Sequence, residues 1–234
     1  MKIAELGLNH LGNIRYFNNY LNKLEMTNVD AITCQILDKS FFINNNMNSY
    51  YIDNDYLLKS LIAFKKKTKK KIGIATQSDL IIDIIKNYKI NFVKILSVSS
   101  NNYKVLEAFF KRTNYFIYIS VGLSKDSDLK KMLKYFNKYK KRIGLIHTNF
   151  NPHINNTNLS RINYLKNKFH KNVSFGLHCK NHLPLSLSPC FGATNQFFYI
   201  KGSSVKIHPD QDHAILIKDI NITIEQIANS YYSI

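Results

Sequence analysis

The sequence has few cysteines and no long hydrophobic run. Its three cysteines, Cys34, Cys179 and Cys190, show no Cys-x-x-Cys spacing, and an odd, sparse set of this kind indicates a reducing compartment. No stretch approaches the roughly 20 apolar residues of a membrane span. The first apolar run is short and is interrupted by Glu5, so it does not resemble a signal peptide. We therefore expect a soluble, cytoplasmic protein that does not contact membranes.

Acidic residues are also scarce, with 15 Asp and Glu against 33 Lys and Arg, which gives a formal net charge of +18. Nucleic-acid binding would favour basic residues interleaved with aromatic residues on one element. The densest basic runs, 65–71 and 138–142, instead each end a predicted helix, where cations interact favourably with the helix dipole. We expect these runs to be solvated faces, and we expect no nucleic-acid partner. The positive field is expected to attract anionic substrates.

Two further patterns are missing, and their absence narrows the fold. No Gly-x-Gly-x-x-Gly follows the first predicted strand, which weakens the dinucleotide-binding alternative, and no low-complexity linker divides the chain. Apolar runs of strand length instead alternate with helical stretches. The predicted strands are 3–8, 31–37, 72–76, 92–97, 116–123, 143–149, 173–179 and 197–202. The predicted helices are 14–26, 55–67, 79–88, 102–112, 125–139, 158–169, 184–195 and 222–232.

Eight strand–helix units in this length predict an α/β fold, a closed (β/α)8 TIM barrel, as a single domain over residues 1–234. The segment 44–54, between the second strand and its helix, is expected to be a long polar loop. In such a barrel the chemistry lies at the carboxyl ends of the strands. The polar residues found there are therefore the candidates for a functional site.

Two charged residues lie inside apolar strands. Glu5 is in the first predicted strand and Lys94 is in the fourth. A buried charge is costly unless it is paired, and that cost is tolerated most often at a functional site. The alternative for each residue is a side chain that faces solvent.

Further polar residues collect at the predicted strand ends and in the loop after the last strand. They are Asn9, His10, Thr33, Gln35, Thr76, Gln77, Ser97, Ser99, Ser120, His147, Asn149, His178, Cys179, Lys180, Tyr199, Lys201, His208, Asp210, Asp212 and His213. A lysine with several hydroxyls and an amide forms a suitable anion site. Two carboxylates, Glu5 and Asp212, could orient hydroxyl groups or move protons.

The order and spacing of these motifs resemble the N-acetylneuraminate (sialic acid) synthase family over nearly the whole chain. The opening strand with its Asn-His-x-Gly turn is similar to 3–13, and the second to fifth strands of the family are similar to 31–35, 74–79, 92–97 and 119–123. The sixth and seventh strands are similar to 145–149 and 175–177. The segment 209–214 resembles the family's Pro-Gly-Pro-Asp-His-Ala segment after the eighth strand.

The resemblance implies a condensation of phosphoenolpyruvate with an N-acylated amino sugar, which releases phosphate and gives a nine-carbon keto acid. It implies that Glu5 is the acid/base near the reacting carbons and that Gln35 and Asp212 hold the sugar. The residues implied to bind phosphoenolpyruvate or a similar anion are Lys94, Ser97, Ser120, Asn149 and, at the position of a family serine, His178.

Several positions depart from the family pattern. A second-strand lysine of the family is Thr33 here, and a glutamate after the fourth strand is Ser99. The two histidines that hold a divalent metal in the family fall on Lys180 and Tyr199. A protonated ammonium cannot ligate a cation and a neutral phenol is a poor ligand, so we expect no cofactor and no tightly held metal at that place.

A relocated metal site is the alternative, because imidazole and thiolate ligands suit zinc or a similar ion. Its candidate ligands are His147, His178, Cys179, His182, His208 and His213. Without a ligand spacing on one helix, ordinary pocket-lining or exposed residues are the simpler interpretation.

The domain organisation also departs from the family. Family members pair so that the C-terminal antifreeze-like domain of one subunit covers its neighbour's site. We expect no such domain in 1–234, and therefore a homodimer that pairs in a different way. Two functions remain open. One is a divergent synthase that joins phosphoenolpyruvate to a sugar-like acceptor, and the other is a catalytically reduced barrel that binds a ligand or a partner synthase.

Overall fold

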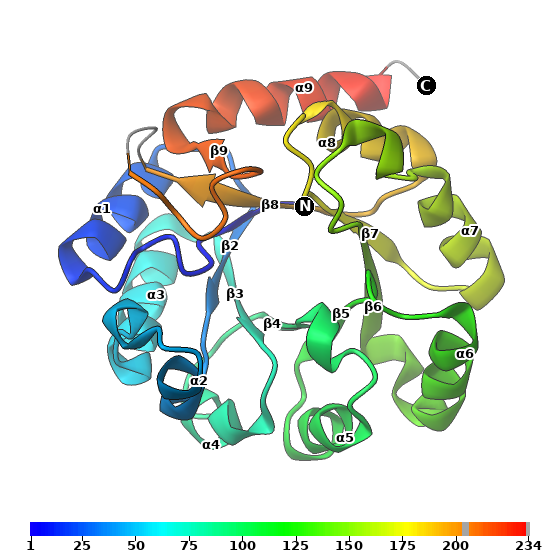
Figure 1. Ribbon diagram of the computed structural model, residues 1–234, viewed down its shortest axis with the longest axis horizontal. Helices are drawn as coiled ribbons and strands as arrows, with labels where there is room; N and C mark the ends of the chain where they lie inside the picture. Colours follow the sequence, from blue (N-terminus) through cyan, green and yellow to red (C-terminus); the bar gives the residue numbers. More distant parts are fainter. Residues whose placement is uncertain (203–205, 233–234) are drawn as a thin grey trace.

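Eight parallel strands close into a barrel, because β1 pairs with β2 on one side and with β8 on the other (Figure 1). The computed structural model describes residues 1–202 and 206–232. The strands are β1 (Lys2–Glu5), β2 (Ala31–Gln35), β3 (Lys71–Thr76), β4 (Phe92–Ile95), β5 (Phe116–Ser120), β6 (Ile143–Thr148), β7 (Val173–Gly176) and β8 (Gln196–Lys201), with a short β9 (Ile215–Leu216) added beside β8. The (β/α)8 barrel predicted from the alternation is confirmed.

Helices surround the barrel as an outer ring (Figure 1). They are α1 (Ile14–Glu25), α2 (Lys39–Asn44), α3 (Asn54–Thr68), α4 (Ile82–Ile85), α5 (Tyr103–Arg112), α6 (Asp126–Tyr135), α7 (Ser160–Phe169), α8 (Leu183–Leu187) and α9 (Ile220–Tyr232). Short 3₁₀ helices are η1 (Asn48–Tyr50), η2 (Asp79–Ile81), η3 (Ser97–Ser99), η4 (Asn137–Arg142), η5 (Ile154–Asn156), η6 (Ser188–Phe191) and η7 (Ile217–Asp219).

Local sequence explains where several helices begin. The Asn13 side chain accepts a hydrogen bond from the backbone N–H of Tyr16 and so caps α1. Asn102 caps α5 in the same way, through the backbone N–H of Val105. Such caps satisfy N–H groups that have no partner within the helix. The first turns of α1 and α5 are therefore fixed by the asparagine just before each helix.

Some elements differ from the prediction. The predicted helix 184–195 is only α8 followed by η6, and 79–88 is η2 followed by the single turn α4. Pro189 lies in η6 and has no backbone N–H, so it cannot continue an α-helix there. The polar segment 44–54 contains η1 and the Asp53 cap of α3, and α2 precedes it.

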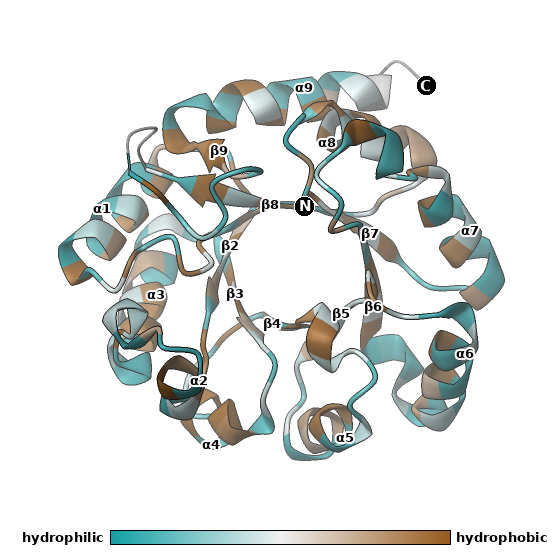
Figure 2. Cartoon of the chain, viewed as in Figure 1, coloured by the Kyte–Doolittle hydropathy of each residue, from teal (hydrophilic) through white to brown (hydrophobic). Residues whose placement is uncertain are grey.

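The hydrophobic core has two parts. The larger part lies between the strands and the helices, where the apolar faces of the helices point inward (Figure 2). The smaller part fills the amino-terminal half of the barrel and consists of Ile3, Ala31, Phe92, Tyr118, Ile146 and Phe197. Gly73 is required beside this inner cluster, because a Cβ there would clash with the Phe92 ring. The barrel is closed below the candidate site by these side chains.

Candidate active site

On several strands of the barrel, a polar side chain lies two residues beyond the apolar inner layer. Side chains on a strand alternate between its two faces, so residues i and i+2 point the same way. Ile3 is followed in this way by Glu5 on β1, and Phe92 is followed by Lys94 on β4. The same spacing places Tyr199 above Phe197 on β8. Strand alternation therefore brings these polar groups to the carboxyl end of the barrel.

Glu5 and Lys94 form an ion pair inside the barrel. The Lys94 Nζ atom donates to Glu5 Oε1 at 2.5 Å and to Oε2 at 2.7 Å, and each residue is 2% exposed. The Thr33 hydroxyl lies 3.4 Å from Glu5 Oε1 and donates a third hydrogen bond. Burial of two charges is costly, and mutual pairing offsets much of that cost. The two charges that the sequence singled out are each other's partner.

Aromatic rings border the lysine. The Lys94 Nζ atom lies 5.4 Å from the centroid of the Phe197 ring and 5.5 Å from that of Tyr199, within the range of cation–π attraction. Burial of Tyr199, and then the nearby charges of Glu5 and Asp210, hold the pKa of its phenol well above the ordinary value. Tyr199 is therefore a neutral phenol, and it narrows the space above the ion pair.

A second carboxylate, Asp210, reaches this site from the loop after β8. The backbone N–H of Asp210 donates to Asn9 Oδ1 at 3.1 Å, and Asn9 Nδ2 donates to the Ile200 carbonyl at 2.8 Å. Its side chain is 19% exposed. Burial, and then repulsion from Glu5, raise the pKa of Asp210 to about 7, against an opposing effect of Lys94.

Two imidazoles stand beside Tyr199. The ring centroids of His178 and His213 are 4.6 Å apart, and both rings contact Tyr199. Burial lowers the pKa of His213 to about 4 and that of His178 well below its ordinary range. Both imidazoles are therefore neutral near pH 7. The Phe150 ring packs on His178 from the loop after β6.

Two serines provide hydroxyl groups at the ends of β4 and β5. The Ser97 and Ser120 hydroxyls are 2.7 Å apart, and both residues are buried. Ser100 donates to the Ser97 carbonyl at 2.8 Å, which fixes the turn. Small hydroxyl side chains held in this way can donate to an anion.

Other residues predicted for the site lie at its edge. Asp212 is 63% exposed and pairs with Lys180 at 3.3 Å on the surface. The Asn149 side chain accepts from the Asn151 N–H at 2.9 Å and donates to the Asn156 carbonyl, so it stabilises its own loop. Gln35, the last residue of β2, is half-buried.

The residues at the family's metal positions do not fit a divalent ion. Lys180 is an exposed ammonium paired with Asp212, and Tyr199 is a buried neutral phenol. Among residues 1–202 and 206–232, no three His, Cys, Asp or Glu side chains are grouped so that they could hold a metal ion. Of the candidates for a relocated site, His147 bonds the Thr157 carbonyl at 2.9 Å and His208 bonds the Tyr16 hydroxyl at 2.9 Å.

The role of Asp210 was not predicted from the sequence. Asp210 and Asp212 lie in one loop, and Asp212 was the carboxylate predicted to orient hydroxyl groups or move protons and, from the resemblance, to hold the sugar. The structure brings Asp210 to Tyr199 and Glu5 and leaves Asp212 in solvent. Two carboxylates separated by one residue give no local signal that shows which one points inward.

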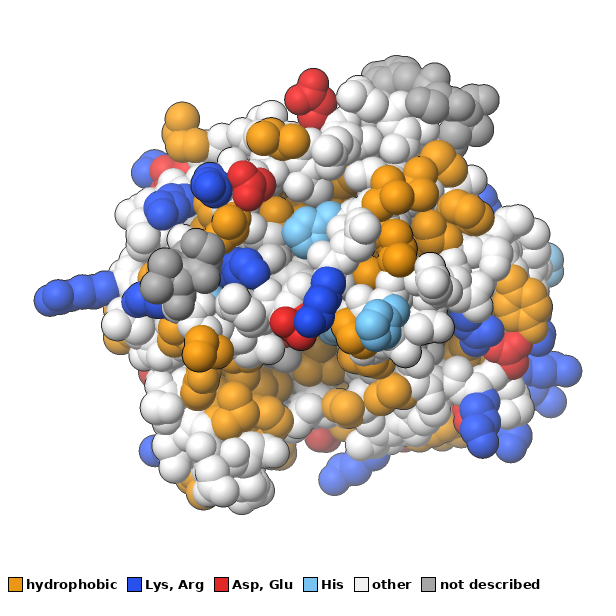
Figure 3. Space-filling view, turned by 45° about the horizontal axis from the view of Figure 1, so that its top comes forward, with side chains coloured by type: hydrophobic (Ala, Val, Ile, Leu, Met, Phe, Trp, Pro, Cys, Tyr) orange, Lys and Arg blue, Asp and Glu red, His pale blue; other side chains and the backbone are white. Residues whose placement is uncertain are grey.

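The residues of the basic runs 65–71 and 138–142 are exposed or half-buried. On the face drawn in Figure 3, Lys and Arg side chains are scattered among other side chains. In the part of the chain that the structure describes, no helix has the length and apolar character needed to cross a membrane.

Solved structures of similar fold were found. The chain superimposes on the N-acetylneuraminic acid (sialic acid) synthetase of Leptospira borgpetersenii serovar Hardjo-bovis with a TM-score of 0.89 and 19% identity, and the match covers 99% of this chain and 84% of that one. The putative spore coat polysaccharide biosynthesis protein E of Chromobacterium violaceum gives 0.88 and 16%, covering 99% and 75%. The spore coat polysaccharide biosynthesis protein SpsE of Bacillus subtilis gives a TM-score of 0.86 and 16% identity, and the match covers 100% of this chain and 68% of that one.

Identities this low show a shared fold and nothing further. The comparison with curated proteins gave no match. The family evidence comes from the sequence itself, because the NeuB family model matches residues 63–230, more than two thirds of the chain. That range includes β4 with Lys94 and the loop with Asp210. The chain belongs to the NeuB family.

Proposed function

We propose that this chain is a synthase of the sialic acid type. It condenses phosphoenolpyruvate, or a similar anion, with an N-acylated amino sugar or a related electrophile at the carboxyl end of the barrel. Membership of the NeuB family and the fold of the sialic acid synthetase support a reaction of this class. The identity of the acceptor sugar and the identity of the anion are further parts of this proposal.

The observation that carries the proposal is the buried Glu5–Lys94 pair. A buried lysine is costly unless it is paired, and Lys94 is paired with Glu5, the residue expected to act as the acid/base. In the proposed complex Lys94, Ser97 and Ser120 donate to the anion, with Asn149 and His178 at the rim. Glu5 acts beside the reacting carbons, and Gln35 and Asp212 contact the sugar from the outer edge.

A second function is supported by a different observation. Both carboxylate oxygens of Glu5 are bonded to Lys94, and Tyr199 lies over the same ammonium. If these contacts persist in solution, the barrel is catalytically reduced and binds a ligand or a partner synthase without turnover. An anion must displace at least one of these contacts in the synthase, and none is displaced in the reduced barrel.

The test is an assay with phosphoenolpyruvate and a panel of N-acylated amino sugars, read as phosphate release and as the mass of a keto acid product. We expect turnover that Ser120→Ala lowers and that the exposed variant Lys130→Ala leaves unchanged. Phosphate release without a new keto acid would contradict a condensation. Absence of turnover with every acceptor, in protein that is folded by circular dichroism, would favour the reduced barrel.

A homodimer and a cytoplasmic location stay predictions. Light scattering that gives a monomer mass at high protein concentration would contradict the dimer.

A further inference from the structure

We propose that Asp210 is a catalytic residue of this site, the acid that gives a proton to the carbonyl oxygen of the acceptor, and that His213 positions its carboxyl group. The proposal rests on the synthase function proposed above. Three carboxyl groups, those of Glu5, Asp210 and Asp212, lie at the carboxyl end of the barrel, which we call its mouth. In the described structure Glu5 and Asp212 each have a lysine within 3.3 Å, and Asp210 has none.

The local backbone makes room for the Asp210 carboxyl. Gly7, in the turn after β1, has φ of +54°, and a Cβ there would lie 2.7 Å from Asp210 Oδ2 and 2.9 Å from the Tyr199 ring. Any other residue at Gly7 would push both groups away. Asn9, from the same turn, holds the Asp210 backbone N–H. Two segments some 200 residues apart in sequence are thus joined at this carboxyl group.

The surroundings of Asp210 favour a bound proton. Glu5 faces it from β1, Lys94 from β4, Tyr199 from β8 and Tyr20 from α1. Lys94 is the cation among these groups, and both of its short contacts go to Glu5. His213 Nε2 lies 3.6 Å from Asp210 Oδ1, but its imidazole is neutral near pH 7.

The contrast with Asp212 identifies the acid. Asp212 lies in the same loop, but it is exposed and has the Lys180 ammonium 3.3 Å away. The Asp210 carboxyl, in contrast, is 19% exposed and has no Lys or Arg at hydrogen-bonding distance in the described structure. Asp210 is shielded and keeps its proton to a higher pH, as a general acid requires.

The proton has a defined place in the reaction. The enol carbon C3 of phosphoenolpyruvate forms a bond to the acceptor carbonyl carbon, and the electron pair of that carbonyl moves to its oxygen. Asp210 gives this oxygen a proton, and a hydroxyl results. Water then adds to C2, one of its protons returns to Asp210, and the bond from C2 to the phosphate oxygen breaks. The second proton of the water leaves with the phosphate, so the acid is restored.

In this scheme a carboxylic acid supplies the polarisation of the carbonyl at a site whose family metal positions hold Lys180 and Tyr199. His213 acts through Asp210: its buried Nε2 atom lies 3.6 Å from Oδ1, just beyond hydrogen-bonding distance, and has no hydrogen-bond partner among the described residues, so a small shift of either side chain would join them. His178 packs on His213 and limits the orientation of that ring.

The experiment compares Asp210→Asn with Asp212→Asn in the full chain. For the wild type we expect kcat to fall as the pH rises past the pKa of the acid. Asp210→Asn should lower kcat about a hundredfold or more and abolish this fall, as expected when a general acid is lost. Its binding of phosphoenolpyruvate, measured by calorimetry, should stay within about threefold of the wild type. Asp212→Asn should retain the fall of kcat at high pH.

A third variant separates positioning from folding. His213→Asn should lower kcat and shift the pH at which it falls, whereas a purely structural role would lower the melting temperature and leave the pH profile in place. Wild-type activity that survives Asp210→Asn with an unchanged pH profile would overturn the role of Asp210 alone. A wild type with no turnover for any acceptor would overturn the synthase proposal, and this role with it. A misfolded Asp210→Asn, detected by circular dichroism, leaves the pH profile of His213→Asn as the deciding result.

Discussion

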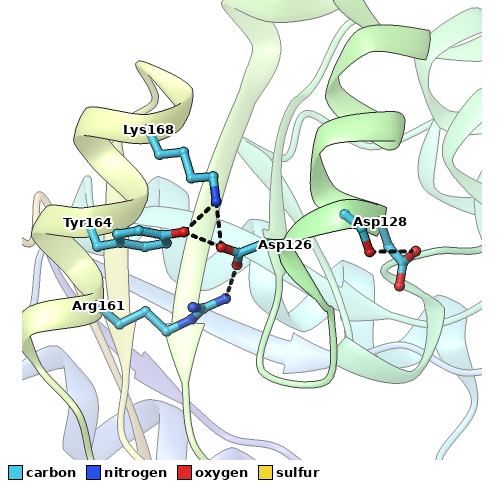
Figure 4. A network of polar contacts seen from close by, with 6 residues as sticks. Asp126, Asp128, Arg161, Tyr164 and Lys168 are labelled. Atoms are coloured by element: carbon cyan, nitrogen blue, oxygen red, sulfur yellow. Dashed lines mark hydrogen bonds and ion pairs between the residues drawn. The ribbon is translucent and has the colours of Figure 1, made fainter.

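Two carboxylates of this chain have opposite surroundings. Asp126, at the start of α6, accepts hydrogen bonds from Arg161, Tyr164 and Lys168 on α7 (Figure 4). Asp210, at the mouth of the barrel, has a neutral imidazole and a second carboxylate nearby instead. The Asp126 side chain is 28% exposed, and the helices that it joins lie outside the barrel.

The pKa values of these two aspartates are therefore shifted in opposite directions. The hydrogen bond from Lys168, followed by those from Tyr164 and Arg161, holds the pKa of Asp126 well below its usual range. Burial raises the pKa of Asp210 to about 7. A carboxylate with several cationic donors stabilises a helix joint and has no proton to give. A buried carboxyl group without a paired cation lowers the stability of the folded protein at neutral pH, and its raised pKa suits acid/base catalysis.

The largest expected effect is the loss of one half of the buried ion pair. Lys94→Met should lower the free energy of unfolding by about 3–5 kcal/mol, because it leaves Glu5 buried and unpaired. The matched exposed variant Lys168→Met should cost about 1 kcal/mol or less. Urea unfolding of both variants measures the difference. Equal losses of stability in Lys94→Met and Lys168→Met would contradict the predicted effect of burial. The double variant Glu5→Gln/Lys94→Met should regain much of the stability lost in Lys94→Met, because it leaves no unpaired charge.

The second effect is a pH dependence of opposite sign at the two carboxylates. Because the folded chain raises the pKa of Asp210 above the ordinary 3.8, its contribution to stability is greatest below about pH 4 and is lost as the pH rises to about 7. Asp210→Asn should therefore be more stable than the wild type at pH 8, by on the order of 2–4 kcal/mol.

The lowered pKa of Asp126 gives the reverse result. Its contribution is present at neutral pH and is lost as the pH falls through the acidic range, so Asp126→Asn should be the less stable protein at pH 7 and equal to the wild type in acid. Thermal unfolding from pH 2 to pH 8 measures both variants, because the Asp126 contribution is lost below the ordinary pKa of 3.8. If both variants were more stable than the wild type at high pH, or both less stable, the predicted difference between the two carboxylates would be wrong.

Anion binding should be affected at the mouth alone. Lys94→Ala should weaken the binding of phosphoenolpyruvate or phosphate by roughly 1.5–3 kcal/mol, the scale of hydrogen bonds to a charged group. Ser120→Ala, which leaves the ion pair intact, should cost about 1 kcal/mol. Calorimetry on folded protein gives these values, with Lys130→Ala as the surface control. An unchanged affinity in both site variants would place the anion elsewhere.

The smallest expected effect is that of a chelator. Lys180 and Tyr199 occupy the family's metal positions, so purified protein should contain little manganese and any turnover should survive chelation. Elemental analysis before and after dialysis measures this. One manganese per chain, lost together with activity, would contradict it. Stoichiometric zinc would support a relocated site, with His147→Ala and His178→Ala as the first variants to assay.

The elements could be predicted from the sequence where the hydrophobic pattern matches the burial found in the structure. Alternating apolar and helical segments predicted the barrel, and single charges in apolar strands predicted Glu5 and Lys94. The prediction was less successful at 184–195 and 79–88, where helices are cut into short turns. Their lengths depend on packing against the barrel and, at Pro189, on one missing N–H group.

By itself, the sequence determined the barrel and its polar layer, because a strand has a period of two residues and this period places Glu5 and Lys94 on the inner face. Only the tertiary structure decided which loop carboxylate joins them. Asp210 points inward because Asn9 binds its N–H and Gly7 leaves room for its oxygen, and both contacts join the two ends of the chain. Loops have no periodicity that could show this from local sequence, so the direction of each side chain follows from long-range contacts.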